Sequence, residues 1–177
     1  MGISYDKGHG VAKNEKEAAR WYRFAAEQGL AEAQFNLGGM YDHGKGVTKN
    51  VKEAARWYRL AAEQGNAEAQ FHLGIWYDGC HGVSKNEKEA ARWYRFAAEQ
   101  GHAEAQFNLG ILYDEGHGVA KNEKEAAQWY RFAAEQGHGE AQFNLGILYN
   151  EGHGMAKNEK EAARWYHLAA EQGLGEA

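Results

Sequence analysis

Residues 103–138 read AEAQFNLGILYDEGHGVAKNEKEAAQWYRFAAEQGH, and this stretch decides the fold because the rest of the chain consists of copies of it. The copy at residues 67–102 differs from it at six positions. The other copies are a partial one at residues 1–30, full ones at residues 31–66 and 139–174, and the start of another at residues 175–177. A period of about 20–50 residues is typical of solenoids and other repeat arrays. We therefore predict a single array over residues 1–177, in which each copy contacts mainly its neighbours.

The composition argues against several kinds of partner. The 177 residues carry a formal net charge of −5 and show no basic stripe, so we expect no nucleic-acid partner. No run approaches the roughly 18 apolar residues of a membrane span, so we expect no membrane partner. The single cysteine, Cys80, cannot form an internal disulfide, and the first residues lack a signal region. Together these features slightly favour a cytoplasmic location.

Each copy divides into two helical segments, which in the copy at residues 31–66 are expected at about 31–42 and 51–64. Asn50 precedes the second segment and Glu53 follows three residues later, a pairing typical of a capping box. Gly65 stands where a left-handed residue ends a helix. One apolar face of the second segment gathers Ala54, Trp57, Tyr58, Ala61 and Ala62 at helical spacing.

The first segment has an apolar side and contains a glycine that recurs in every copy. Ala33, Leu37, Met40 and Tyr41 share the side that we expect in the core. A mid-helix glycine such as Gly38 is unfavourable by about 1 kcal/mol relative to alanine, so its repetition predicts that a Trp or Tyr of the partner helix approaches the backbone there.

The loop between the two segments is expected to turn tightly. Gly116 and Gly118 flank His117, which predicts positive φ angles, and Val119 is expected to anchor the loop. Cys80 replaces the glycine of the other copies, so that turn is expected to be strained or remodelled around Gly79. A mainly solvated face of the second segment should carry charge pairs among Lys52, Glu53, Arg56, Arg59 and Glu63.

The chain resembles the Sel1-like repeat, a relative of the tetratricopeptide repeat, over its whole length. The residues that carry the resemblance in the copy at 31–66 are Ala33, Leu37, Gly38 and Tyr41, then Gly44, Gly46 and Val47, then Ala54, Trp57, Tyr58, Ala61, Ala62 and Gly65. The resemblance implies an all-α, right-handed solenoid of antiparallel helix pairs whose first helices line a concave face. It also implies a non-enzymatic adaptor or scaffold, without catalytic residues, metal or cofactor.

The side of the first segment opposite the core is our candidate peptide-binding surface. It combines phenylalanines and isoleucines with acidic and amide groups, which suits a protein or peptide with apolar anchors and basic residues. Its residues are Glu32, Phe35, Asn36, Glu68, Phe71, His72, Ile75, Glu104, Phe107, Asn108, Ile111, Glu140, Phe143, Asn144 and Ile147. The alternative is that the phenylalanines pack between adjacent copies and expose only their ring edges.

Other features suggest alternatives. Trp165, Tyr166 and Ala169 would lack a covering helix, which predicts an exposed apolar end and a self-assembling structural solenoid through end-to-end contact. The remote alternative is a hydrolase that uses Cys80 and His81, although no oxyanion donor is identifiable. The loop histidines could pair with an aspartate, as His117 with Asp114, but two ligands are too few for a zinc site, so we predict no metal. The apolar residues at the edge of the second segments either seal a seam between copies or form a second exposed stripe; they are Phe24, Leu60, Phe96, Phe132 and Leu168.

Overall fold

Helices fill most of the residues that the computed structural model describes, which are residues 14–79, 81 and 83–173. No strand occurs in this part of the chain. The helices are α2 (Glu15–Glu27), α3 (Ala31–His43), α4 (Val51–Glu63), α5 (Ala67–Gly79), α6 (Glu87–Glu99), α7 (Ala103–Glu115), α8 (Glu123–Glu135), α9 (Gly139–Glu151) and α10 (Glu159–Ala170). The expected all-α fold of repeated helix pairs is confirmed, and the helix bounds lie within one residue of those expected for the copy at 31–66.

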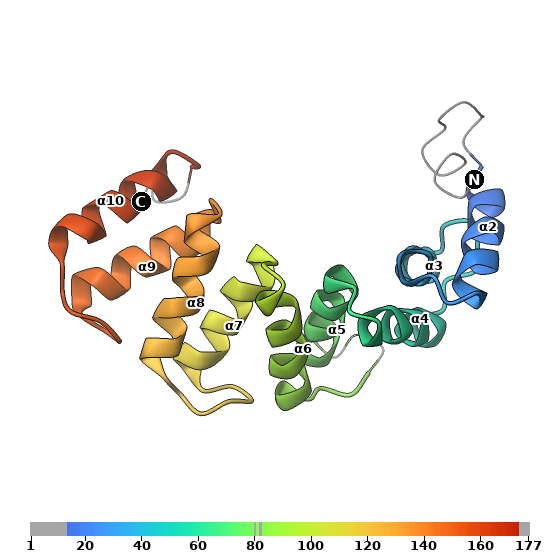
Figure 1. The fold of residues 1–177 in the computed structure, drawn as a ribbon, viewed down its shortest axis with the longest axis horizontal. Coiled ribbons are helices and arrows are strands. Elements are labelled where there is room, and N and C mark those ends of the chain that lie inside the picture. The colour runs from blue at the N-terminus through green and yellow to red at the C-terminus, as the bar shows by residue number, and fades with distance from the viewer. Residues whose placement is uncertain (1–13, 80, 82, 174–177) are drawn as a thin grey trace. The chain divides into compact units, whose positions relative to one another are not determined.

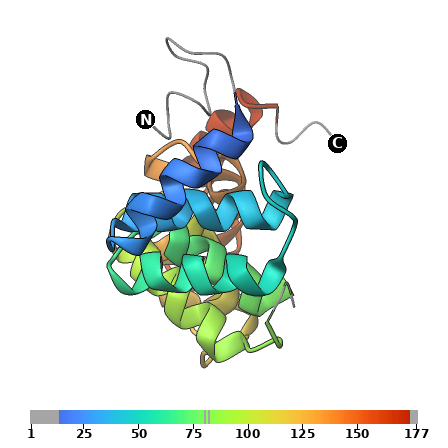
Figure 2. The same ribbon diagram turned by 90° about the vertical axis from the view of Figure 1, so that its right-hand side faces the viewer.

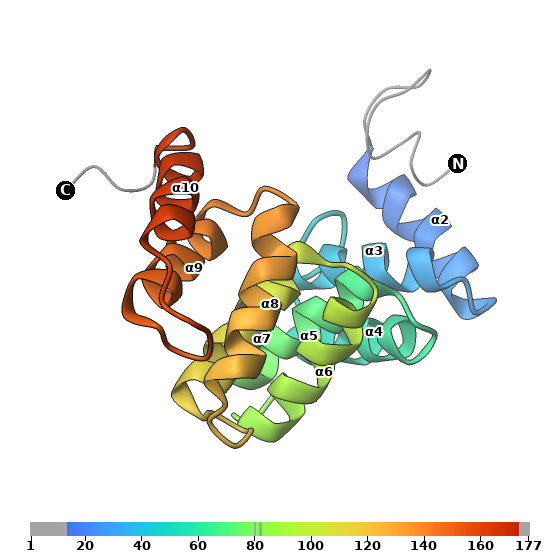
Figure 3. The same cartoon turned by 60° about the vertical axis from the view of Figure 1, so that its left-hand side comes forward.

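The chain divides into two compact units, Met1–Lys85 and Asn86–Ala177, which we call unit 1 and unit 2. Unit 1 contains α2 to α5, and its core gathers alanines with Tyr22, Leu37, Met40 and Trp57. Unit 2 contains α6 to α10. Within each unit every helix packs against the next one along the chain, as Figures 1 and 2 show for α2 to α4 and Figure 3 for α9 and α10. That the units form one uninterrupted array stays a prediction.

The second helix of each pair begins at an asparagine cap. The Asn50 Oδ1 accepts a hydrogen bond from the backbone N–H of Glu53 at 3.2 Å, which confirms half of the expected capping box. The other half is wrong. The Asn50 N–H donates to the carbonyl of Tyr41 at 2.9 Å, one of the last carbonyls of α3, which has no partner inside its own helix. The Glu53 side chain instead lies 3.4 Å from the Arg56 guanidinium.

The same helices end at the glycines that the sequence singles out. Gly65 has a φ of 89° and donates its N–H to the Ala62 carbonyl at 3.0 Å. Asn66 donates to the Ala61 carbonyl at 3.1 Å, which completes a Schellman motif. This motif turns the chain within two residues, so that α5 packs back against α4.

The recurring mid-helix glycine lies against a tyrosine ring. A Cβ placed on Gly38 would lie 2.8 Å from Cδ1 of Tyr58, and one on Gly110 would lie 2.6 Å from Cδ1 of Tyr130. Both distances are shorter than real carbon contacts, so only glycine admits the ring. The expected close approach of the partner helix is therefore confirmed, and the residue that approaches is the tyrosine.

The loops after α3, α7 and α9 dock on the preceding copy. Gly46, with a φ of 67°, lies against α2, where a Cβ would come within 2.0 Å of the Glu15 carbonyl oxygen. Gly118 contacts the Glu87 carbonyl in the same way in unit 2. Val47 packs against the core of unit 1, as expected of a loop anchor. The two glycines thus serve both the turn and the contact between copies.

A buried glutamine in α3, α7 and α9 joins three helices, which the sequence did not reveal. In α3, the Gln34 Nε2 donates to the Ala26 carbonyl at the end of α2, at 3.1 Å. Its Oε1 accepts a hydrogen bond from the Gln64 Nε2 after α4, at 2.7 Å. Gln106 and Gln142 repeat both contacts in unit 2. The burial of these amides is stabilising only because both ends are paired.

The expectation of an exposed apolar end is wrong for two of its three residues. Trp165 is 6% exposed and Ala169 is fully buried, because α9 of the same pair packs over them. Tyr166 is half-buried, whereas the equivalent Tyr58 is 1% exposed. The difference arises because the rings of His72 and Trp76, in the following copy, contact the Tyr58 ring.

Candidate functional site

The candidate residues of the first helices lie at the molecular surface in both units. We call the set predicted above the first-helix surface. Its glutamates are exposed, its phenylalanines, amides, isoleucines and His72 are half-buried, and Phe143 is 38% exposed. Unit 1 presents the members in α3 and α5, and unit 2 presents those in α7 and α9. Their role in binding stays a prediction.

The phenylalanines of this surface are held by rings from the following helices. The centroid of Phe35 lies 5.6 Å from that of Tyr58, and Phe107 lies 5.8 Å from Tyr130. Phe107 also stacks on His138 at 4.6 Å. Each of these rings is therefore packed on one side and accessible on the other. This arrangement lies between the two alternatives that the sequence left open, a fully exposed binding surface and rings packed between copies.

Unit 1 contains a cavity of about 220 Å³ within this surface. Aromatic rings and polar groups share its wall, and no carboxylate is part of it. The lining residues are Tyr22, Phe35, Asn36, Gly39, Met40, His43, Lys45, Tyr58 and His72. Gly39 stands where the other first helices carry Ile75, Ile111 and Ile147, so a side chain present elsewhere is missing here.

The polar groups of the cavity include a tyrosine hydroxyl, a histidine, an amide and a lysine. Burial, and to a smaller extent the charge of Asp42, raises the pKa of Tyr58 above its ordinary value, so its hydroxyl stays protonated. The His43 Nδ1 lies 2.9 Å from the Gly39 carbonyl, to which it donates, and 3.9 Å from the Asp42 carboxylate. Within the described part of the chain, no carboxylate pairs with Lys45.

The equivalent region of unit 2 is filled and differently charged. Ile111 replaces Gly39, Glu115 replaces His43, and His117 replaces Lys45. Burial and then the Asp114 charge raise the pKa of Tyr130, while a hydrogen bond from the Asn144 side chain acts in the opposite direction. The two units therefore have the same helix packing here, but the residues at the surface differ in size and charge.

One predicted acidic residue already has a partner in its own unit. The His138 Nδ1 accepts the backbone N–H of Ala141 at 3.2 Å, so its proton resides on Nε2. That nitrogen donates to the Glu104 carboxylate at 3.0 Å, and the His138 side chain is only 7% exposed. Glu104 is therefore less available to a basic partner than Glu32, and the Glu140 carboxylate lies 4.0 Å from the same nitrogen.

Sequence reasoning missed an arginine–tyrosine pair between copies. Arg59, expected on a charged solvated face, donates to the Tyr77 hydroxyl, eighteen residues along the chain. Arg131 and Tyr149 form the same hydrogen bond at 2.7 Å, and the guanidinium lies 5.8 Å from the ring centroid. The constant spacing of eighteen residues in every copy was the available signal. Arg56, in contrast, forms the expected charge pair with Glu53.

The edge residues of the second helices are exposed at three positions, one in unit 1 and two in unit 2. Phe24 is 61% exposed, Phe96 is 37% and Phe132 is 39%. Leu60 instead packs against the core of unit 1, and Leu168 is half-buried. Both alternatives left open by the sequence therefore occur, at different copies.

The described loop histidines His117 and His153 lie beside glutamates of their own loops. The His117 Nδ1 lies 3.0 Å from the Glu115 carboxylate and does not face Asp114 as the metal hypothesis required. Among the described residues, no three His, Cys, Asp or Glu side chains are placed to hold a metal ion. Cys80, on which the hydrolase alternative and the remodelled turn depend, lies outside the described residues. No described helix is both long and apolar enough to cross a membrane.

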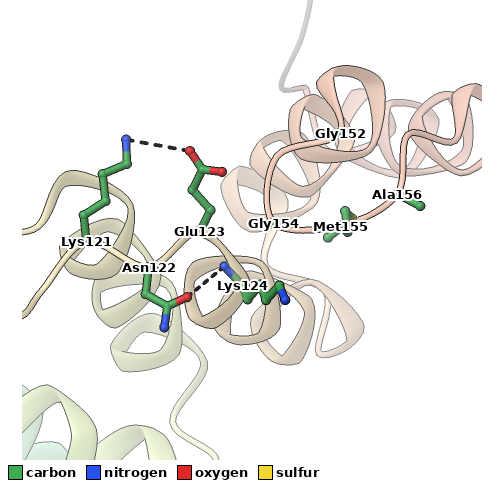
Figure 4. Close-up of a pocket in the computed structure, with 8 residues that line it drawn as sticks. All are labelled: Lys121, Asn122, Glu123, Lys124, Gly152, Gly154, Met155 and Ala156. Atoms are coloured by element: carbon green, nitrogen blue, oxygen red, sulfur yellow. Dashed lines mark hydrogen bonds and ion pairs between the residues drawn. The ribbon is translucent and has the colours of Figure 1, made fainter.

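A second cavity, of about 730 Å³, lies in unit 2 where the loop after α9 passes the start of α8 (Figure 4). Lys121 and Glu123 at its rim pair with each other at 3.9 Å, and the Asn122 side chain accepts the N–H of Lys124. Gly154 and Met155 form the loop side of the cavity. Because its wall consists of the cap and the loop contact already described, it is explained by the joining of two copies.

The geometry agrees with that of known repeat proteins. The sequence model of the Sel1 repeat matches residues 1–30, 31–66, 67–102, 103–138 and 139–174. A Sel1 repeat protein from Oxalobacter formigenes is 46% identical, with a TM-score of 0.87, over 97% of this chain and 68% of that one. A protective antigen of uropathogenic Escherichia coli strains, which displays the same repeat fold, is 39% identical with a TM-score of 0.94. The alignment covers 97% of this chain but only 37% of that antigen.

One more distant solved structure is similar over a smaller part of this chain. Cysteine-rich protein B of Helicobacter pylori is 26% identical, with a TM-score of 0.56, over 71% of this chain and 90% of that one. No match was found among curated proteins. The repeat matches and the two more similar structures establish a solenoid-like repeat fold. The chain belongs to the Sel1 repeat family, whose members are typically non-enzymatic scaffolds that mediate protein–protein interactions.

Proposed function

We propose that the chain is an adaptor that binds a segment of a partner protein along the first-helix surface. The observation that carries the proposal is that Phe35, Phe107 and Phe143 are partly exposed and are each held on one side by a tyrosine of the next helix. A ring that is already fixed loses little conformational freedom on binding, so it is a good anchor for a partner. That this surface lines a concave groove, as the family resemblance implies, stays a prediction.

The partner that fits this surface has apolar side chains flanked by basic residues. Apolar side chains would contact the accessible sides of rings such as Phe35 and Phe107, and basic ones would pair with Glu32 and Glu140. The exposed acidic pairs should add mainly association rate and orientation, and the desolvated rings should supply most of the affinity. An extended or helical segment could present such anchors at regular spacing.

The test is a random-peptide selection on the intact chain, with affinities of the selected peptides measured on variants. Phe35→Ala and Phe107→Ala should each weaken binding about tenfold or more, the range of a hot-spot residue. The matched control is Phe132→Ala, which removes an equally accessible ring from a second helix. Thermal unfolding of each variant separates lost contact from lost stability. Equal affinity for Phe107→Ala and Phe132→Ala would contradict the proposal.

A second candidate function is self-association through the exposed stripe on the second helices. It is favoured by Phe24, whose side chain is 61% exposed, together with Phe96 and Phe132. Isolated exposed apolar residues are common, whereas a series on one helix type more often marks a contact surface. Sedimentation over a wide concentration range should then show oligomers that Phe24→Ala weakens. A monomer at every concentration would exclude this function.

A further inference from the structure

The cavity at Gly39 is the one place where unit 1 offers a partner more than an accessible ring. Its volume of about 220 Å³ exceeds that of a cavity of about 150 Å³ that admits benzene. It is smaller than the roughly 300–1,000 Å³ of sites for drug-sized ligands. The cavity therefore has the size for a single side chain that carries one ring.

Its wall selects among such side chains. The rings of Phe35, Tyr58 and His72 meet around it, with centroids 5.2–5.6 Å apart, and the Met40 side chain completes the lining. Aromatic rings prefer edge-on or offset contacts at such separations, and methionine sulfur contacts ring edges favourably. An aromatic side chain thus finds more matching contacts here than an aliphatic one.

The charge at the cavity distinguishes it from the rest of the first-helix surface. Lys45 has no carboxylate partner among the described residues, and the Asn36 amide lies on the same wall. Asp42 offsets part of this charge, but its carboxylate does not line the cavity. In unit 2 the equivalent of His43 is Glu115, which reverses the sign. An anionic group beside the ring is therefore favoured in unit 1 alone.

We infer that the Gly39 cavity binds one aromatic side chain of the partner segment and that Lys45 pairs with an acidic residue next to it. The inference rests on the proposed function, because the same surface must hold the rest of the segment. It adds a direction to the complex. The partner residues at the Gly39 cavity are aromatic and acidic, whereas those that face exposed glutamates, such as Glu32 near the start of the same helix, are basic.

The probes for this inference are phenylpropionate and its uncharged amide, phenylpropionamide, added to the full chain and followed by amide and aromatic NMR. Phenylpropionate should shift the signals of Gly39, Tyr58 and His72, and it should bind about two- to fivefold more tightly than the amide, as expected of an exposed ion pair. Equal affinity of the two probes, or shifts elsewhere in the chain only, would overturn the inference.

Four variants sharpen the test. Gly39→Ile restores the residue of the other first helices and should abolish binding of both probes, while Gly39→Ala should retain it. This is because a Cβ at Gly39 meets only the Tyr58 hydroxyl, at 3.5 Å. Lys45→His should remove the preference for phenylpropionate, and Lys52→His, on the exposed face of α4, should not. Unchanged binding in Gly39→Ile would overturn the inference even if Gly39→Ala behaves as expected.

Unit 2 provides an independent check. Ile111→Gly should open a second cavity that admits phenylpropionamide at least as well as phenylpropionate, because Glu115 stands where unit 1 has His43. A chain that selects peptides but ignores both probes overturns the cavity inference and leaves the proposed function intact. A chain that binds phenylpropionate at Gly39 but selects no peptide contradicts both the proposed function and the assignment of the cavity to a partner side chain.

Discussion

Gly38 and Gly39 are adjacent in α3, but only Gly38 lacks space for a side chain, and the equivalent residues in unit 2 show the same difference. A Cβ on Gly38 would lie 2.8 Å from the Tyr58 ring, and Gly110 is held against Tyr130 in the same manner. A Cβ on Gly39 would only touch the Tyr58 hydroxyl at 3.5 Å, and unit 2 accommodates Ile111 there. The first position is fixed by packing inside the pair, and the second is free to vary.

Comparison of the two units therefore distinguishes the residues that hold the helices together from those that vary at the surface. Loop glycines, buried glutamines and tyrosine rings make the same contacts in both, whereas substitutions at positions such as Gly39, His43 and Lys45 change the shape and charge of the candidate site. The comparison predicts equal effects of equivalent scaffold changes in unit 1 and unit 2. It predicts unequal effects only at positions such as Gly39 and Ile111.

The largest expected effect is loss of the fold in alkaline solution, in both units together. Folded Tyr58 and Tyr130 have pKa values raised above that of an unfolded tyrosine, about 10. Above that pH the unfolded chain releases protons that the folded chain keeps, so stability falls as pH rises, and it is unaffected by these groups at lower pH. Circular dichroism across an alkaline titration measures the loss.

The control for alkaline unfolding is the double variant Tyr58→Phe and Tyr130→Phe. Phenylalanine keeps the ring that packs against Gly38 and Gly110 but has no proton to release. We expect its unfolding to begin at a higher pH than in the unchanged chain. If the two proteins unfold at the same pH, the buried tyrosines do not control alkaline stability.

The next largest effect is expected at the loop glycines. Gly46→Ala and Gly118→Ala should each lower the free energy of unfolding by more than about 3 kcal/mol, since backbone strain of about 1–2 kcal/mol adds to an overpacked contact. In both, the new Cβ would overlap a backbone carbonyl, of Glu15 or Glu87, which cannot rotate away. Denaturant titrations of both variants give the comparison between units.

Gly65→Ala is the matched control for these glycines. It has the same kind of positive φ, 89°, but nothing lies within 4 Å of its added Cβ. Its free energy of unfolding should therefore fall only by the cost of the backbone strain, about 1–2 kcal/mol. A Gly118→Ala variant no less stable than Gly65→Ala would show that the loop does not dock as described.

Much of the scaffold could be predicted because its signals are short and repeated. The cap at Asn50, the stop at Gly65 and the close approach at Gly38 each depend on one residue type at one place in a helix. Backbone chemistry restricts such places to a few side chains, so the residue type identifies the structure. The return half of the capping box was wrong because the Tyr41 carbonyl, from the preceding helix, competes for the same N–H.

The remaining features depend on contacts between copies, which a single helix does not encode. Gln34 is polar in the middle of a helix, and only the carbonyl of Ala26 and the amide of Gln64 explain its burial. Arg59 has the appearance of a solvated charge until Tyr77 is placed beside it. Of the candidate site, the residues on the outer side of the first helix could be chosen from their spacing. The Gly39 cavity could not, because its space depends on where the Tyr58 ring ends.

The buried glutamines should give a moderate effect that is equal in the two units. Gln34→Ala and Gln106→Ala remove two hydrogen bonds of a buried amide, one to the carbonyl of Ala26 or Ala98 and one from Gln64 or Gln136. Each should lower stability by about 1–3 kcal/mol, because each lost hydrogen bond contributes about 0.5–1.5 kcal/mol. Gln128→Ala, at an exposed position of α8, should change stability by less than about 0.5 kcal/mol. Unequal losses of stability for Gln34→Ala and Gln106→Ala would show that the helix packing of the two units is not equivalent.

The smallest effect, and the finest test of that equivalence, is at the helix caps. Asn50 accepts one backbone N–H, from Glu53 at 3.2 Å, whereas Asn122 accepts two, from Lys124 at 3.1 Å and Glu125 at 3.2 Å. Asn50→Ala and Asn122→Ala should each reduce stability by about 1 kcal/mol, and Asn122→Ala should lose slightly more.

Aspartate is the discriminating substitution at these caps, because it offers the same acceptor and adds a negative charge at the helix N-terminus. Asn122→Asp should therefore keep or slightly raise stability, which thermal unfolding can resolve. The backbone bond from Asn122 to the Tyr113 carbonyl survives both substitutions, so any loss reports the side chain alone. If Asn122→Asp is as destabilising as Asn122→Ala, the asparagine is required for the turn that precedes the helix, and the cap is not its main contribution.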